Sequence, residues 1–203
     1  MIILKIFRIL LSKIRNQKTD FFLRYKYFEI CKNYGRKCLD IGAGSGRFAK
    51  FLLKRGHGIK AIDVVDKSEH PELNLKVFNG KSIPFMDKEF DTSILMFVLH
   101  HTDHAAELLK ECVRVTSNKI IIGEDIISCG VDRMLGNIHL GTSPWSKSSN
   151  GFKTDRAWIQ LFSSYNLRLI DSVEIPRGIY PVYPVIRKIY VLEVASQQTI
   201  LCG

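Results

Sequence analysis

A glycine-rich segment contains the residues whose spacing most clearly indicates a ligand site. The sequence Cys-Leu-Asp-Ile-Gly-Ala-Gly-Ser-Gly places Asp40 before three glycines at alternate positions, Gly42, Gly44 and Gly46. An apolar stretch leads into this segment and helix-compatible residues follow it, which predicts a strand, a tight turn and a helix. Glycines in such a turn let a ligand approach the backbone N–H groups closely. The Asp40 carboxylate would repel a pyrophosphate and attract an ammonium or sulfonium group.

The spacing of the glycines separates several kinds of nucleotide site. A dinucleotide site expects G-x-G-x-x-G, but here the third glycine comes one residue early and Arg47 occupies the expected place. No Gly-Lys-Ser or Gly-Lys-Thr follows, so the phosphate-binding P-loop is absent. The pattern D-x-G-x-G-x-G resembles motif I of the class I S-adenosylmethionine-dependent methyltransferases. The alternative is a turn whose glycines bind no ligand.

Two downstream segments fit the same resemblance. Residues 59–63 predict a second strand that ends in Asp63, 21 positions after Gly42. An acid at about this distance accepts hydrogen bonds from ribose hydroxyls in nucleotide-binding α/β folds, so Asp63 is the candidate ribose ligand, with Asp66 as a nearby competitor. Asn79 and Gly80 occupy the position of a family acid–small pair that borders the adenine. Asn79 replaces the usual Asp, and its amide oxygen is expected to bond the adenine amino group.

A long apolar run supplies the third element. Residues 89–101 are almost uninterruptedly apolar and predict a strand buried on both faces, ending in Leu-His-His. This run resembles the fourth strand of the branch that includes ubiquinone and menaquinone biosynthetic enzymes (methyltransferase type 11). The resemblance covers residues 36–125. It implies that Met96 and Phe97 face the methionine part of S-adenosylmethionine, that Asp40 lies near its amino-acid end, and that the motif I glycines admit the cofactor to the backbone.

The resemblance also implies a fold, namely α/β with a Rossmann-like, doubly wound, seven-stranded mixed sheet. The expected strand order is 3-2-1-4-5-7-6, with the last strand antiparallel and helices on both faces. A helix over about 103–115 and a fifth strand over 119–124, joined through Thr116-Ser117-Asn118, continue this pattern.

The last third of the sequence is expected to choose the substrate. Residues 125–153 are rich in Gly, Ser and Asn and lie beyond a strand end, which favours a substrate lid, with a disordered loop as the alternative. Thr154 is a suitable N-cap for a helix over 155–165. Residues 167–175 and 189–195 predict an antiparallel hairpin.

The first 37 residues hold most of the net charge. They contain ten Lys or Arg and two acidic residues, so they carry +8 of the total +10. We divide the chain into a basic leading helical segment, 1–35, and a methyltransferase domain, 36–203. The leading segment is expected either to pack over the cofactor site, to attach to an anionic membrane through Met1–Arg15, or to dock on nucleic acid. No apolar run in it approaches the ~18 residues that span a bilayer.

Composition indicates an ordinary globular chain in a reducing compartment. Hydrophobic residues make up 46% of the 203 residues and charged ones 25%. The five cysteines are odd in number and show no metal-ligand spacing, which favours buried, reduced thiols, no metal site and a cytoplasmic location. No secretory signal is expected, because charges interrupt the first apolar stretch.

Three histidines follow the fourth strand and are candidate bases. His100, His101 and His104 have side chains that titrate near neutral pH, and His101 is the one we expect closest to the reacting centre. A base is needed only where the acceptor must lose a proton. The alternative is that the His100–His101 pair is a packing pattern at the strand end.

The sequence favours a methyltransferase that acts on a small-molecule or lipid-like acceptor. The first alternative is an RNA methyltransferase that docks through the basic segment. The Asn or Asp before Pro-Pro-aromatic that marks amino-group nucleic-acid enzymes is absent, because Met96-Phe97-Val98-Leu99 stands in its place. A protein side-chain methyltransferase is the second alternative, and a catalytically silent cofactor-binding scaffold is the third.

Overall fold

The computed structural model describes residues 36–130, 132–134, 151–175 and 186–195. The basic leading segment with Met1–Arg15, most of the expected lid and the hairpin connection therefore lie outside the described residues. Among the described residues, no helix is long and apolar enough to cross a bilayer.

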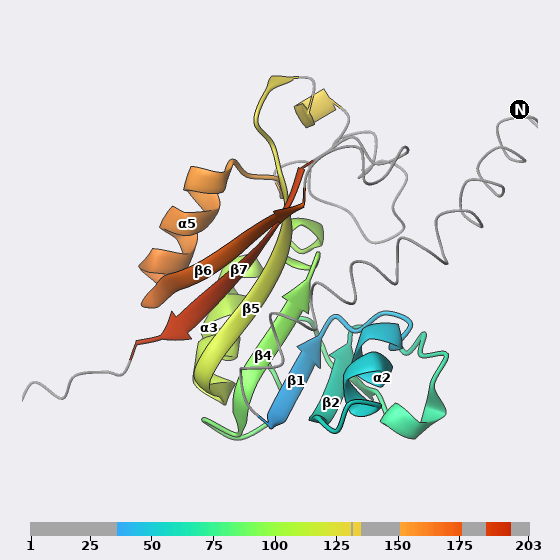
Figure 1. The fold of residues 1–203 in the computed structure, drawn as a ribbon. Helices are drawn as coiled ribbons and strands as arrows, with labels where there is room; N and C mark the ends of the chain where they lie inside the picture. The colour runs from blue at the N-terminus through green and yellow to red at the C-terminus, as the bar shows by residue number, and fades with distance from the viewer. Residues whose placement is uncertain (1–35, 131, 135–150, 176–185, 196–203) are drawn as a thin grey trace, which may run out of the picture.

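Seven strands form one mixed sheet in the order β3-β2-β1-β4-β5-β7-β6, which confirms the predicted topology. Strands β1 to β5 run parallel, and β7 pairs antiparallel with both β5 and β6 (Figure 1). Parallel strands end at the same edge of the sheet, and the loops at this edge hold the site described below. The strands are β1 Lys37–Ile41, β2 Gly58–Asp63, β3 Lys76–Val77, β4 Phe90–Met96, β5 Thr116–Ile126, β6 Leu167–Ile175 and β7 Ile186–Val194.

Helices cover both faces of the sheet, because its central strands are apolar on both sides. Ile120 and Ile122 of β5 belong to the core cluster shared with α3 (Ala105–Val115) and α5 (Asp155–Ser164). Ile121, which points the other way, belongs to the cluster shared with α2 (Arg47–Leu53). Figure 1 shows α2 and α3 on opposite faces.

The elements that depend on local signals match the prediction. Helix α2 follows the glycine turn directly, as expected. Thr154 caps α5, because its hydroxyl oxygen accepts a hydrogen bond from Ala157 N at 3.2 Å. Strands β6 and β7 form the predicted antiparallel pair, although β7 begins three residues earlier than expected, at Ile186.

The prediction for the middle of the chain was wrong at three boundaries. Strand β4 ends at Met96 instead of His101, because Phe97 adopts a left-handed conformation (φ 61°) and Leu99–His101 form a 3-10 turn, η2. Strand β5 begins at Thr116, so the three residues expected to connect α3 to it are part of the strand. It also extends to Ile126, so the lid does not begin at residue 125.

The cysteines follow the expectation in part. Cys38 and Cys112 are buried in the core, and burial raises the pKa of the Cys38 thiol to about 11. Cys129 is exposed, which corrects the expectation that it is buried. Cys31 and Cys202 lie outside the described residues.

Candidate active site

The glycine turn after β1 is held tightly on one side and open on the other. Gly42, Gly44 and Gly46 all have positive φ, at 74°, 55° and 74°. Gly42 N donates to Ile62 O at 2.9 Å, and a Cβ on Gly42 would lie only 2.5 Å from a methyl group of Val98. A Cβ on Gly44 would meet no atom within 4 Å. The turn is therefore packed at Gly42 and leaves open space beside Gly44.

Asp63, at the end of β2, joins this turn to the neighbouring loop. Its Oδ2 accepts a hydrogen bond from Gly44 N at 2.7 Å, and its Oδ1 accepts one from Val64 N at 2.6 Å. Each carboxylate oxygen has a second acceptor position beyond these bonds. Asp66 instead accepts from Ser68 N within its own loop, at 3.0 Å.

A cavity of about 540 Å³ opens between these loops. A volume of this size is typical of sites for small ligands and cofactors. Seven residues selected from the sequence line it: Gly42, Gly44, Asp63, Gly80, Phe97, His101 and His104. Six others, Asp40, Gly46, Asp66, Asn79, Met96 and His100, are not among its lining residues.

Sequence reasoning missed most of the apolar wall of this cavity. Val64 and Val65 follow Asp63, and Phe78 precedes Asn79, so each adjoins a residue that the sequence did select. Val98 and Leu108 complete the apolar lining. Adjacency to a strand end is the signal that would have found the first three.

Asp40 lies in the core below the glycine turn and is 3% exposed. Burial is the main cause that raises the pKa of its carboxyl to about 7, and the charge of Asp63 adds to the rise while the backbone N–H of Ala49 opposes it. No described residue donates a hydrogen bond to its buried Oδ2. The carboxyl thus titrates near neutral pH and has an unused acceptor atom.

The Asn79 side chain shapes its own loop. Its Oδ1, the atom we assigned to the adenine amino group, accepts from Lys81 N at 2.9 Å and from Ser82 N at 2.8 Å. Gly80, at φ 77°, and Phe78 present this loop to the cavity.

Arg114 of α3 anchors the far end of that loop and was not anticipated. Its guanidinium donates to Ile83 O at 2.8 Å and to Phe85 O at 2.9 Å, and it is paired with Glu111. Glu111 in turn accepts from Ile83 N at 2.8 Å. From sequence alone these two residues are an ordinary helical (i, i+3) ion pair.

The exit of β4 is fixed by the end of β5. Phe97 N donates to Gly123 O at 2.8 Å, and a Cβ on Gly123 would lie 2.8 Å from Met96 Sδ. The guanidinium carbon of Arg187, on β7, lies 4.6 Å from the centre of the Phe97 ring. Phe97 is thus held between β5 and β7 where it lines the cavity.

The three histidines have different surroundings. His101 and His104 line the cavity, and His104 Nδ1 lies 3.6 Å from Glu107 Oε1. His100 is fully buried, with its Nδ1 2.5 Å from Glu124 Oε2. Burial lowers the pKa of His100, but the charge and hydrogen bond of Glu124 outweigh it and raise the pKa overall.

Comparisons with known proteins show which family the chain resembles. The methyltransferase domain family matches residues 39–121. An uncharacterized protein of Methanocaldococcus jannaschii is 35% identical over 160 residues, which are 69% of this chain and 75% of that protein. The demethylmenaquinone methyltransferase of Streptomyces griseus is 29% identical over 97 residues, 44% of this chain and 42% of that enzyme.

The fold is shared with solved methyltransferases. The 1,6-didemethyltoxoflavin-N1-methyltransferase of Burkholderia thailandensis, solved with 1,6-didemethyltoxoflavin and S-adenosylhomocysteine, superposes with a TM-score of 0.67 at 16% identity. The superposition covers 95% of this chain and 90% of that one. Motif I, the strand order and the family match agree, and the chain belongs to the class I S-adenosylmethionine-dependent methyltransferases.

Proposed function

We propose that this methyltransferase acts on a small-molecule or lipid-like acceptor, with its cofactor in the cavity beside the glycine turn. The observation that carries the proposal is the cavity itself, about 540 Å³ with Val64, Val65 and Phe78 among its walls. The named relatives that act on demethylmenaquinone and on 1,6-didemethyltoxoflavin support a small acceptor.

The residues present fit an adenosine-containing cofactor. Asp63 offers acceptor positions to the ribose hydroxyls, and the valines and Phe78 offer apolar surface to the adenine. The open side of Gly44 admits the ligand to the backbone, and Gly42 and Gly46 hold the turn that makes this opening. Gly80 borders the adenine, with Asn79 shaping the loop that carries it.

The methionine part of the cofactor is assigned to the opposite side of the turn. The buried Asp40 carboxyl supplies negative charge for the cofactor ammonium, directly or through water. Phe97 faces the methionine part, with Met96 packed behind it against Gly123.

Bound S-adenosylmethionine supplies an activated methyl group on a sulfonium centre. The protein then has to hold the acceptor in line and exclude water, which positioning residues accomplish. His101 is the candidate base for acceptors that must lose a proton.

The proposal is tested with methyl-labelled S-adenosylmethionine and a fractionated extract. We expect label to enter the small-molecule or lipid fraction. Label in RNA or protein would overturn the acceptor class, and tight binding of S-adenosylhomocysteine with no label anywhere would identify a silent scaffold. Calorimetry that detects no binding of S-adenosylhomocysteine to the folded protein would remove the cofactor site itself.

A further inference from the structure

The end of β5 contacts the turn after β4 through one buried carboxylate. Glu124 is 0% exposed and uses both of its oxygens on neighbouring residues of η2. Oε1 accepts from Leu99 N at 2.8 Å, and Oε2 lies 2.5 Å from His100 Nδ1. One side chain therefore fixes the backbone and a ring of the turn at once.

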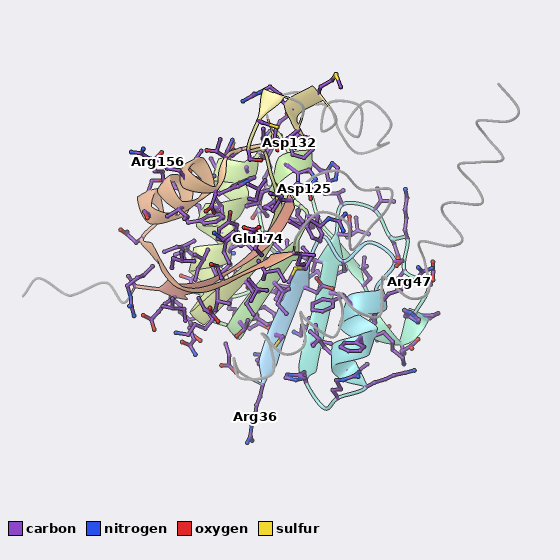
Figure 2. All side chains as sticks on the ribbon, turned by 45° about the horizontal axis from the view of Figure 1, so that its top comes forward. Arg36, Arg47, Asp125, Asp132, Arg156 and Glu174 are labelled. Atoms are coloured by element: carbon purple, nitrogen blue, oxygen red, sulfur yellow. The ribbon has the colours of Figure 1, made fainter. Side chains whose placement is uncertain are left out.

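The negative charges around His100 favour its protonated form, the imidazolium. Glu124 and Asp125 face it from β5, with Asp125 Oδ2 3.9 Å from His100 Nε2. Arg187 of β7 pairs with Asp125 at 3.4 Å. Lys188 lies opposite Glu124 in the sheet, but its ammonium donates to Asp155 and not to Glu124. Arg187 thus balances one of the two buried carboxylates of β5, and a neutral His100 would leave the other uncompensated, which is costly. Figure 2 shows Asp125 at the sheet edge where β5 ends.

Packing holds the His100 ring from its other sides. Phe152 stacks on it with ring centres 4.9 Å apart, and the His101 ring lies 4.0 Å away. Gly151 passes so close that a Cβ there would lie 2.0 Å from His100 O. The ring is therefore held in one place, and the next residue along the chain is the one that lines the cavity.

We infer that Glu124 and His100 form a buried carboxylate–imidazolium pair that positions the η2 turn, and with it His101, at the cavity. Neither residue of the pair is among those that line the cavity, so both act through the turn as positioning residues. The consequence for cofactor binding rests on the proposed function, whereas the ion pair does not.

The first test is a pH titration of the histidine ring nitrogens of the wild-type protein by NMR, with no ligand. We expect His100 to keep both ring protons at a pH above the ordinary pKa of a histidine side chain, about 6.5. Loss of a ring proton from His100 at or below that pH would overturn the ion pair. This arm needs no variant to fold.

The second test compares Glu124→Gln with a matched control, Glu89→Gln. Like Glu124, Glu89 accepts a hydrogen bond from a backbone N–H, that of Met86, with one oxygen, and its other oxygen contacts the cation of Lys60. Glu89 lies just before β4, at the end of that strand away from the cavity. We expect Glu124→Gln to make His100 neutral and to weaken binding of S-adenosylhomocysteine at least tenfold, with Glu89→Gln within twofold of wild type. Glu124→Asp, which keeps the charge but shortens the reach, should leave His100 protonated and still weaken binding.

These measurements separate the two hypotheses. The positioning role would be overturned if Glu124→Gln bound S-adenosylhomocysteine as tightly as wild type. It would also be overturned if both Gln variants lost affinity in proportion to their losses of Tm. If the wild-type protein itself binds no S-adenosylhomocysteine, the proposed function fails. Positioning is then judged from the His101 ring resonances, which should shift in Glu124→Gln and stay in place in Glu89→Gln.

Discussion

The turns after β1 and after β4 border the same cavity, yet they are built in opposite ways. The first presents backbone, with glycines at positive φ and N–H groups bonded to Ile62 and Asp63. The second is fixed by buried side chains, among them Glu124 and His100. A site made of backbone groups can be predicted from local sequence, because the spacing of the glycines forms the turn. A site fixed by side chains depends on strands that are far apart in the sequence and meet only in the folded sheet.

The largest effect should come from a change in the turn after β4, and it should be a loss of turnover. His101→Ala is expected to lower the rate of label transfer about 100-fold, the size typical of a lost general base, while the affinity for S-adenosylhomocysteine changes less than threefold. His104→Ala, at the other cavity histidine, should leave transfer within about threefold. Equal losses of turnover and affinity in His101→Ala would make His101 a structural residue.

The next largest effect should come from a change in the glycine turn after β1, and it should be a loss of affinity. Gly44→Ala and Gly56→Ala both place a side chain at positive φ (55° and 84°) with no atom within 4 Å, so both should cost about 1 kcal/mol of folding stability. Only Gly44 lines the cavity, and its new methyl group should weaken S-adenosylhomocysteine about 50-fold by calorimetry. Equal affinities in the two variants would show that the cofactor does not approach this turn.

A smaller effect distinguishes the two candidate ribose ligands. Asp63→Asn should weaken S-adenosylhomocysteine about tenfold, because hydrogen bonds to a charged acceptor are worth about 1.5–3 kcal/mol. Asp66→Asn should stay within twofold, since Asp66 bonds Ser68 N and does not line the cavity. The reverse ranking would move the ribose to the Asp66 loop.

The smallest effect on affinity should come from replacing Asp40. The replacement should stabilise the fold while it weakens ligand binding. The folded pKa of Asp40, raised to about 7 by burial and by Asp63, means that its ionisation destabilises the fold as pH rises from about 4 to 7. Asp40→Asn removes this cost and should raise the free energy of unfolding at pH 8 by about 4 kcal/mol, since each pKa unit corresponds to about 1.36 kcal/mol. The same variant should weaken S-adenosylhomocysteine about fivefold at pH 8.

The pH profile checks the assignment of Asp40. The ammonium group of S-adenosylhomocysteine favours the ionised carboxyl of Asp40, so wild-type affinity for this ligand should rise with pH and level off above about 7. Asp40→Asn should flatten this rise. An unchanged rise in the variant would assign the titration to another group.

The strand order could be predicted because the motifs resemble those of a known family, and the ends of several elements could be predicted from local signals. The glycine turn predicted the end of β1 and the start of α2, and Thr154 predicted the start of α5. The exit of β4 could not be predicted in the same way. An apolar run continues to Leu99, but the backbone leaves the strand because Gly123 and Glu124 of β5 bond Phe97 and Leu99.

The candidate site could be predicted only in part. Of the residues chosen for their place in a motif, Gly44 and Asp63 line the cavity, whereas Asp40 and Met96 do not. Asn79 was also chosen for its place in a motif, but its oxygen accepts hydrogen bonds within its own turn. Glu124 was given no role, because a lone acid at a strand end has many uses and only the folded sheet shows which one applies.

The position of β7 has a consequence for synthesis on the ribosome. Arg187 follows its partner Asp125 by 62 positions, although the two strands are neighbours. A nascent chain that has emerged only through β6 therefore has an incomplete sheet edge at β5, and the Asp125 carboxylate still lacks its guanidinium partner. Closure of this half of the sheet must therefore follow translation of β7, and until then β5 and β6 both have an unpaired edge.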